Sequence, residues 1–358
     1  MSHMTYLEAS VVGLIQGVTE LFPVSSLGHN VLIPALIGGS WAADLNVAKP
    51  ESPYLAYIVG LHVATALAMM IYFWRDWVRI IGGFFSSIRD RQITTIDQKM
   101  AWMIILATVP VGLVGLAFEH EFRVLFGKPI RAAIFLMVNG LILFAGEKFR
   151  TKKSLAADAE LEAAASGTSA SGSAVPGATV AGVSAVPATA AAGGHGAAMH
   201  ASGGHGPAMH ASGQRAERQL EVGRAVQADT RLSKIGYWQA LIIGSAQILA
   251  LLAGISRDGA VMVTGMFRGL SRQDAARFSF LLSTPVILAA GVLKVGDLTG
   301  PLGDGIRGQV LVGSILSGVG AYLSVRFLMK YFQTRTLTPF AIYCLVFGIF
   351  ATIYLSVR

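Results

Sequence analysis

The sequence has little charge for its length. Of its 358 residues, 13% are charged, whereas a typical soluble domain carries about 25%. Hydrophobic residues make up 53%, and the mean hydropathy is +0.59. There is one cysteine, Cys344, so an internal disulfide is excluded and the redox compartment stays open. This composition favours a lipid bilayer as the solvent over a large water-soluble core.

Basic residues outnumber acidic ones, and the formal net charge is +8. In so apolar a chain this charge is better interpreted from its position in loops, and we expect no nucleic-acid partner. We also expect no cleavable signal peptide. The N-terminal segment lacks a basic region, and its first apolar run contains polar residues, including Gln16 and Glu20.

Long apolar runs predict an all-α integral membrane protein. A helix needs about 20 mostly apolar residues to cross a bilayer. Six stretches meet this requirement, at about 53–74, 100–118, 131–149, 275–294, 308–329 and 339–357. Two further apolar stretches, about 5–36 and 237–268, are interrupted by polar residues and glycine. We expect each of these to form a re-entrant helix–turn–helix that enters and leaves on one face.

Lysine and arginine concentrate in alternate connections. The segments 75–99, 150–235 and 330–338 are rich in them, and the intervening loops are poorer. The positive-inside rule places the basic segments in the cytoplasm. Three spans then follow each re-entrant element. An odd number of spans carries the chain to the other side of the membrane, so the second half begins there and has the opposite orientation to the first. The sequence therefore predicts an inverted-topology repeat of residues 1–149 and 236–358, with both termini outside.

Polar motifs repeat in the two interrupted stretches. The first contains Gly13-x-x-Gln16 and Ser25-Ser26-Leu27-Gly28, and the second contains Gly244-x-x-Gln247 and Ser256-Arg257-Asp258-Gly259. Matched positions are 231 residues apart in every pair. Gly, Gln and Ser are common residues, but the agreement with the inversion derived from charge favours two related halves.

The segment 150–235 is rich in alanine, glycine and serine. It contains a ten-residue repeat, GGHGAAMHAS at 193–202 and GGHGPAMHAS at 203–212. Such a segment buries too little apolar area to offset the entropy cost of ordering it. We expect a disordered cytoplasmic linker. Loose binding of a transition metal by its histidines is the less favoured alternative.

The first motif contains groups suited to phosphoryl transfer through a serine. Polar residues at membrane depth are costly, so they are functional candidates. Gln16 and Glu20 are four residues apart and share one helix face. A new helix beginning near Ser25 or Ser26 would present its N–H groups to an anion. With His29 one turn further on, the motif contains a base, a nucleophile and a general acid.

The second motif supplies a cation. Arg257 has a planar guanidinium suited to a phosphate group, and the inverted symmetry would bring it toward the first motif near the midplane. An isolated arginine at that depth would cost at least about 2.5–3.5 kcal/mol. We therefore expect an anionic partner for it, Asp258 or Glu20, until substrate phosphate takes that place.

The same residues also have a purely structural interpretation, in which they cap helices or bond them together. In that interpretation Ser25 and Ser256 are N-caps, and Gln16 bonds helices together. Glu20 would pack as a satisfied pair with His29, and Arg257 would do so with Asp258. His62 lies within a predicted span, and the sequence favours neither a structural nor a functional role for it.

The two motifs together resemble the signatures of the bacterial undecaprenyl-diphosphate phosphatase family of the bacitracin-resistance type. The first signature is matched from Gln16 and Glu20 to Pro23-Val24-Ser25-Ser26-Leu27-Gly28-His29, and the second by Ala253–Gly259. The resemblance covers about 10–149 and 236–357. It implies removal of the terminal phosphate from undecaprenyl diphosphate at the outer face of the bacterial cytoplasmic membrane. That reaction recycles the lipid carrier for cell-wall synthesis and confers bacitracin resistance.

By matching position, the resemblance also implies roles for individual residues. Ser26 would be the nucleophile, Glu20 would activate or orient it, and His29 would be the acid/base. Arg257 and Ser256 would bind phosphate. The remaining candidate substrate-binding residues are Gln16, Ser25, Gly28, Asp258 and Gly259.

Three positions depart from the usual pattern of that family. Ala253 replaces a usual proline, Asp258 stands where serine is frequent, and Val261 stands where threonine is often found. The family is associated with Mg²⁺ or Ca²⁺. The motifs supply few hard oxygen ligands, chiefly Glu20 and Asp258, so we expect any such ion to arrive with the diphosphate. We expect no organic cofactor.

Two other functions remain open. A transporter or flippase of a polyprenyl phosphate lipid is the main alternative, because inverted repeats with broken helices are typical of secondary transporters. Transport needs no activated nucleophile, so a serine, a glutamate and a histidine facing one arginine favour the enzyme. A non-catalytic sensor acting through the histidine-rich linker is the third interpretation. The sequence leaves the oligomeric state open, including a homodimer.

Overall fold

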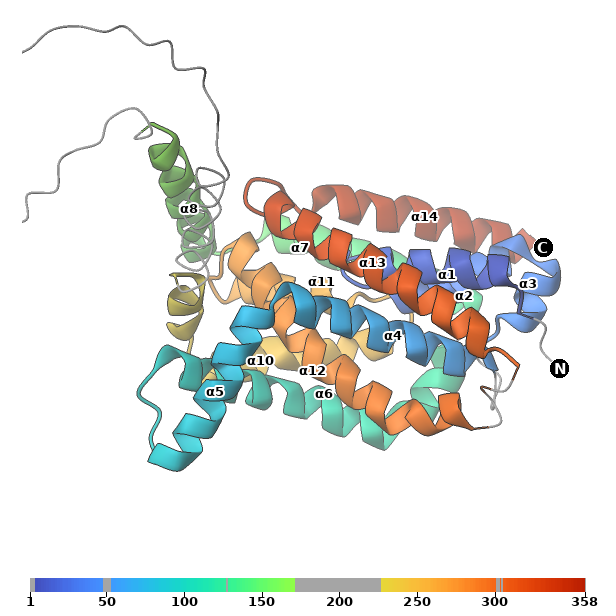
Figure 1. Ribbon diagram of the computed structural model, residues 1–358. Helices are drawn as coiled ribbons and strands as arrows, with labels where there is room; N and C mark the ends of the chain where they lie inside the picture. Colours follow the sequence, from blue (N-terminus) through green and yellow to red (C-terminus); the bar gives the residue numbers. More distant parts are fainter. Residues whose placement is uncertain are drawn as a thin grey trace, which may run out of the picture. The chain divides into compact units, whose positions relative to one another are not determined.

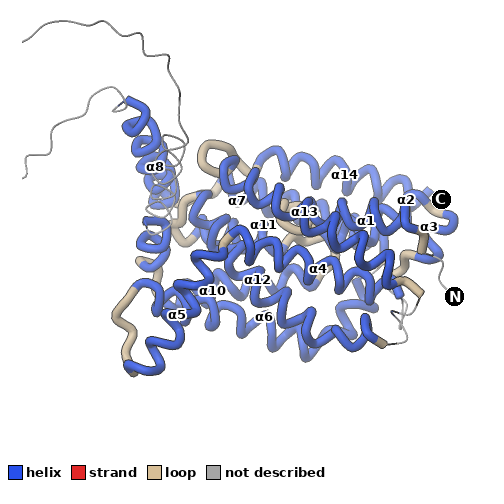
Figure 2. Tube along the Cα trace, viewed as in Figure 1, coloured by secondary structure: helices blue, strands red, loops and turns tan. Residues whose placement is uncertain are grey.

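Helices make up the regular secondary structure of the residues described. The computed structural model describes residues 4–47, 53–126, 128–170, 227–300, 303 and 305–357, and no strand occurs among them (Figure 2). Six helices in this part of the chain are long and apolar enough to cross a membrane. They are α4 (Pro53–Tyr72), residues Ile96–Phe118 of α6 (Ile96–Phe126), α7 (Pro129–Lys148), residues Arg272–Lys294 of α12 (Arg272–Thr299), α13 (Arg307–Tyr331) and α14 (Thr338–Val357). The six predicted spans are thereby confirmed.

The two interrupted stretches form shorter helices joined by buried turns. Helices α1 (Tyr6–Thr19) and α2 (Ser26–Ile37) make up the first stretch. In the second, α10 (Tyr237–Ser245) and the 3₁₀ helix η2 (Ala246–Leu251) precede α11 (Arg257–Phe267). A helix rises about 1.5 Å per residue, so α1 and α2 are each too short for a hydrocarbon core of about 30 Å. Neither helix is therefore long enough to cross such a core alone.

Three further helices are α3 (Gly39–Asp44), α5 (Trp74–Asp90) and α8 (Lys152–Ala170). Residues 152–170 and 227–233 are helical, so both ends of the predicted linker have regular structure. The ten-residue repeats lie outside the described residues. Residues 1–162 and 228–358 form one unit that contains the six long helices, and Figure 1 shows the start of α1 and the end of α14 at the same end of it.

Small residues allow helices from the two halves to approach closely. Helix α1 packs on α13, and α7 packs on α14. A Cβ added to Gly13 would lie 2.5 Å from the carbonyl oxygen of Gly313, and one added to Gly140 would lie 2.8 Å from that of Ala341. Such contacts are typical of membrane helices, which associate through close packing rather than through a difference in hydrophobicity from lipid.

A network of charges joins α5, α12 and the segment before α10. Nη2 of Arg79 donates to Asp76 and to Asp229, at 2.6 Å in each case. Nη2 of Arg277 lies 2.8 Å from Asp229 and 3.0 Å from Asp76. Burial lowers the pKa of the Arg79 guanidinium, but its hydrogen bonds to the two carboxylates raise the pKa above the ordinary value. These arginines therefore stay charged. They connect Asp229, which precedes α10, to α5 in the first half of the chain and to α12 in the second.

The close packing of α1 on α13 can be tested at Gly17, whose added Cβ would overlap the backbone of Ser317. We expect Gly17→Val to lower the stability of the detergent-solubilised protein by about 1–3 kcal/mol, the usual cost of overpacking. Thermal unfolding would measure it. Gly112→Val in α6 is the matched control, because a Cβ there meets nothing within 4 Å. Equal Tm values for the two variants would contradict this account of the interface.

Candidate active site

The two turns predicted to carry the chemistry contact each other directly. The Ser25 hydroxyl oxygen accepts a hydrogen bond from the backbone N–H of Gly254, at 3.2 Å. A Cβ on Gly28 would lie 2.9 Å from the Cα of Gly254, so a larger residue would push the turns apart. Gly254 has φ +111°, a conformation that side chains disfavour. Glycine is thus required at this contact for conformational and steric reasons.

Asn139 in α7 connects the same two turns. Its Nδ2 donates to the carbonyl oxygen of Pro23 at 2.9 Å, and its Oδ1 accepts from the N–H of Ser256 at 3.0 Å. The side chain is fully buried. Sequence analysis did not single out Asn139, although a polar residue in the middle of a predicted span was a usable signal.

Both turns end at the N-terminus of a helix, where each preceding serine is the N-cap. The Ser25 hydroxyl accepts from the N–H of Gly28 at 3.2 Å, and the Ser256 hydroxyl accepts from the N–H of Gly259 at 3.1 Å. Ser25 and Ser256 are themselves buried. Because the turns touch, the positive ends of α2 and α11 are brought together, which favours an anion between them.

Glu20 lies at the centre of the polar residues. Its Oε2 accepts from the Ser26 hydroxyl at 2.5 Å and from Nε2 of Gln16 at 2.7 Å. Its Oε1 accepts from Nη2 of Arg257 at 2.6 Å. The predicted carboxylate, hydroxyl and guanidinium therefore form one connected cluster. Of the two anionic partners expected for Arg257, the structure places Glu20 on it.

His62 of α4 adds a second basic group to this cluster. Its Nε2 lies 3.4 Å from Oε2 of Glu20, and its Nδ1 lies 2.9 Å from the carbonyl oxygen of Ile58. The sequence left the role of His62 open. Its position near the middle of a span was a signal, but which residue it would meet depends on how α4 packs against the rest of the unit.

His29 has a different environment from the one expected. Its Nδ1 lies 2.7 Å from the carbonyl oxygen of Ser25, and its Nε2 lies 2.7 Å from the hydroxyl of Tyr343. The ring stacks on Phe347, with centroids 5.3 Å apart. Thus α2 turns the imidazole toward α14, and both ring nitrogens are engaged there. An acid/base role requires Nε2 to exchange the tyrosine hydroxyl for substrate or water.

Asp258 faces α12. Its Oδ1 accepts from the hydroxyls of Ser279 and Ser283, at 2.7 and 2.6 Å. The residue is fully buried. Asp258 therefore bonds α11 to α12, and it does not form the carboxylate pair with Arg257 that one structural interpretation proposed.

The accessible groups of the cluster are those suited to chemistry. The side chain of Glu20 is only 4% exposed, whereas those of Arg257 and His62 are 15% and 25% exposed. Ser26 is half-buried. A ligand approaching the cluster would therefore meet the hydroxyl, the guanidinium and the imidazole, with the carboxylate behind them.

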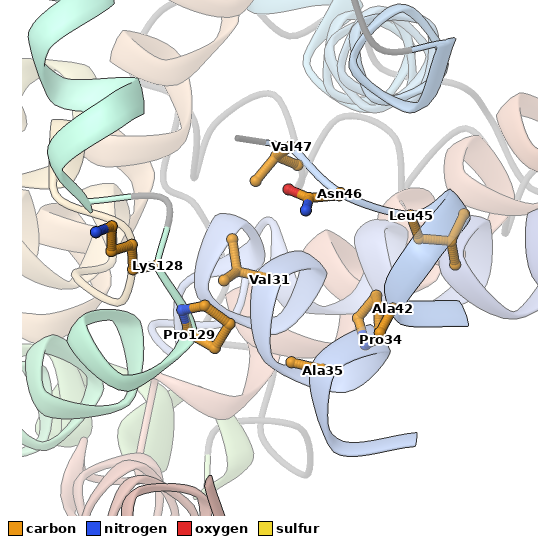
Figure 3. A pocket seen from close by; sticks show the side chains of 9 residues that line it. All are labelled: Val31, Pro34, Ala35, Ala42, Leu45, Asn46, Val47, Lys128 and Pro129. Carbon is orange, nitrogen blue, oxygen red and sulfur yellow. The ribbon is translucent and has the colours of Figure 1, made fainter. Parts of the chain in front are cut away.

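A separate pocket of about 240 Å³ lies beside α2 (Figure 3). It is lined by Val31, Pro34, Ala35, Ala42, Leu45, Asn46, Val47, Lys128 and Pro129. None of the clustered polar residues lines it. We take the hydrogen-bonded cluster as the candidate site, because no hydroxyl, thiol, imidazole or carboxylate side chain lines this mostly apolar pocket.

The described residues do not fit a metal centre built by the protein alone. No group of three or more His, Cys, Asp or Glu side chains in this part of the chain is placed to hold a metal ion. Both oxygens of Glu20 are already hydrogen-bonded, and Asp258 is turned to α12. Mg²⁺ and Ca²⁺ need several oxygen ligands, most of which would have to come from elsewhere.

Known proteins resemble the chain over almost its whole length. Residues 9–193 and 205–350 match the family model described as bacitracin resistance protein BacA. The chain is 51% identical over 357 residues to an undecaprenyl-diphosphatase of Mycolicibacterium paratuberculosis. That alignment covers 100% of this chain and 99% of the relative. The chain is 51% identical over 361 residues to undecaprenyl-diphosphatase 2 of Frankia alni, with all of both chains covered. A Burkholderia orbicola relative with that same name is 34% identical over 340 residues, 95% of this chain and 93% of the relative.

The bridging role of Asn139 can be tested by replacing it with leucine, which has a similar volume but no polar atoms. Asn139→Leu leaves the carbonyl of Pro23 and the N–H of Ser256 buried without this partner. We expect a loss of about 2–6 kcal/mol, because each of the two unsatisfied groups costs about 1–3 kcal/mol. Thermal unfolding in detergent would measure it, with Leu141→Ala on the exposed face of α7 as the control. Stability equal to that of the control would contradict the bridge.

Proposed function

Since this chain belongs to the bacitracin resistance protein BacA family, we propose that it is an undecaprenyl-diphosphatase. It hydrolyses the terminal phosphate of undecaprenyl diphosphate and releases undecaprenyl phosphate, the lipid carrier used in cell-wall synthesis. Full-length relatives that carry this name support the proposal. The six apolar helices agree with a multi-pass membrane protein acting on a lipid.

One observation supports the chemistry above all others. The Ser26 hydroxyl and the Arg257 guanidinium bind the two oxygens of one carboxylate, that of Glu20. A nucleophile, its base and a phosphate-binding cation thus lie side by side, although they come from turns far apart in the sequence. Transport alone would need the cation but not the hydroxyl hydrogen-bonded to a base.

The reaction follows from these contacts. A phosphate oxygen of the substrate takes the place of Glu20 on Arg257, and the N-termini of α2 and α11 add to the positive field. The Ser26 oxygen attacks the terminal phosphorus while Glu20 accepts its proton. The bond from that phosphorus to the bridging oxygen breaks, and undecaprenyl phosphate leaves. Water then attacks the phosphoserine, phosphate is released and the Ser26 hydroxyl is restored.

The supporting residues have separate roles in this scheme. Gln16 orients Glu20, and Ser25, Ser256, Gly28 and Gly259 shape the two helix N-termini that surround the phosphate. We assign these roles from their hydrogen bonds to the cluster and to the turns.

His29 is the acid/base that the family resemblance implies. Its Nδ1 faces the carbonyl oxygen of Ser25 and therefore carries a proton, so Nε2 is the nitrogen available for proton transfer. Once its hydrogen bond to the Tyr343 hydroxyl is broken, Nε2 would protonate the leaving oxygen or deprotonate the attacking water. Asp258 supports the same site indirectly, by fixing the start of α11 to α12.

A divalent cation, if used, would enter bound to the diphosphate. Its ligands would then be mostly phosphate and water oxygens, as is usual for Mg²⁺. Glu20 is the carboxylate of the cluster that could approach it.

We further propose that the two halves form an inverted repeat with the site open to the outer face of the cytoplasmic membrane. Helices α1 and α10 begin 231 residues apart, and so do α2 and α11. Helix α1 packs on α13 and α10 packs on α6, so each re-entrant element contacts a long helix of the other half. The basic connections then lie in the cytoplasm, and both termini lie outside.

The chemical roles can be tested by phosphate release from undecaprenyl diphosphate with purified variants. We expect Ser26→Ala to lower turnover by at least about 10³-fold, because it removes the nucleophile. Arg257→Lys should cost about 10²-fold, because lysine cannot reproduce the guanidinium fork. Arg268→Lys, at the exposed end of the same helix, is the matched control.

Substrate with a radiolabelled terminal phosphate provides a second measurement. Acid quenching should trap label on the wild-type protein and on Arg257→Lys, but not on Ser26→Ala. Wild-type turnover in Ser26→Ala, or label retained by it, would overturn the assigned nucleophile.

The orientation can be tested by labelling single cysteines in intact cells. The native Cys344 is fully buried, so it should contribute little background. We expect an impermeant thiol reagent to label Ser40→Cys, after α2, from outside. Gln92→Cys, after α5, should require permeabilised cells, because the basic connection 75–99 is assigned to the cytoplasm. The reverse labelling pattern would overturn the orientation without affecting the phosphatase assignment.

A further inference from the structure

We propose that His62 is a positioning residue for Glu20, which holds the carboxylate beside Ser26 while Arg257 is bound to substrate phosphate. This inference rests on the proposed phosphatase reaction and adds a residue to it. His62 lies on α4, whereas Glu20 follows α1 and Arg257 begins α11. Three separate elements thus meet at one carboxylate.

The hydrogen-bond geometry determines how His62 meets the carboxylate. Nδ1 lies 2.9 Å from the carbonyl oxygen of Ile58, which can only accept, so Nδ1 must carry a proton. In a neutral ring with that tautomer, Nε2 would present a lone pair to Oε2 of Glu20, which is 3.4 Å away. Two acceptors would then face each other. The favourable arrangement has a proton on Nε2 as well, giving an imidazolium that faces an ionised carboxylate.

Substrate binding changes the charges around Glu20. In the structure Arg257 contacts Glu20 at 2.6 Å. When Arg257 binds phosphate instead, Glu20 loses this contact just as a second anion arrives nearby. Like charges repel at short range, so the carboxylate would be driven from Ser26 or would take up a proton. Either change would remove the base that Ser26 needs.

His62 is suited to prevent this loss. Gln16 and Ser26 also donate to Glu20, but both side chains are neutral. Among the partners of Glu20 that the structure describes, His62 alone can carry a compensating positive charge once Arg257 has moved. Its ring is held by the helical backbone at Ile58, so it need not move with the substrate.

The surroundings of His62 agree with this role. The charged groups facing it are Glu20 at the end of α1 and Arg257 of α11. Helix α4 also packs on α12 and α13. Arg277, near the start of α12, is paired with Asp76 and Asp229. On α13, charged residues occur near the ends, at Arg307, Arg326 and Lys330.

The test compares kcat and KM for undecaprenyl diphosphate in His62→Leu and His62→Gln. Leucine removes the donor, and we expect kcat to fall by about 10²-fold, as is usual when one preorganised donor is lost. KM should change by less than about threefold, because the phosphate is bound by Arg257. Glutamine places an amide N–H near the position of Nε2 but carries no charge, so it should recover only part of the loss and leave kcat about tenfold below the wild type. Leu67→Ala, on the exposed face of α4, is the control.

A double-mutant cycle separates positioning from structural damage. If His62 acts through Glu20, adding His62→Leu to Glu20→Gln should lower the residual kcat by less than about threefold. A full additional 10²-fold loss in that background would overturn the inference. So would a wild-type kcat for His62→Leu, or equal losses for His62→Leu and His62→Gln.

The same assay distinguishes this inference from the proposed function. If the wild-type protein and Leu67→Ala release no phosphate from the substrate, the phosphatase assignment itself is wrong. If both release phosphate and His62→Leu matches them, only the role of His62 is overturned.

Discussion

The ion pair between Glu20 and Arg257 is the interaction on which the rest of the site depends. Two charges removed from water are stabilised only when their geometry is good and their remaining hydrogen-bonding groups are satisfied. Glu20 meets this condition through Ser26, Gln16 and Arg257. The pair joins two turns from opposite halves of the chain. One buried carboxylate therefore brings the Ser26 hydroxyl and the Arg257 guanidinium together.

The fold brings the turns close enough for this pair to form. Glycines at the contacts of α1 with α13 and of α7 with α14 let the backbones approach, and Gly28 and Gly254 do the same where the turns meet. Asn139 satisfies one backbone group from each turn. Non-helical backbone at membrane depth is tolerated only where such partners exist. The features that stabilise the interior are thus the ones that shape the site.

The charges of the cluster are arranged for an anion. A guanidinium and an imidazole lie against a single carboxylate, and two of the residues that contact it, Ser26 and Arg257, begin helices α2 and α11. Glu20 occupies the position on Arg257 that phosphate takes in the proposed reaction, so substrate binding exchanges one anionic partner for another. In this scheme Arg257 always has a counter-charge, and the released carboxylate is then free to serve as the base for Ser26. His62 completes the arrangement because it remains with Glu20 throughout.

Hydropathy and residue spacing alone determined the six spans, the two interrupted stretches and the motifs that contain Ser26 and Arg257. These properties depend on neighbours within a helix or on repetition along the chain, so a sequence shows them directly. The tertiary structure decided that Glu20 pairs with Arg257, that His29 turns to Tyr343, that Asp258 bonds to α12, and that His62 and Asn139 enter the site. The partner of a buried polar group is set by how distant helices pack and rotate against one another. Hydrophobic periodicity shows which face of a helix is apolar, but it does not show which distant helix will pack against that face.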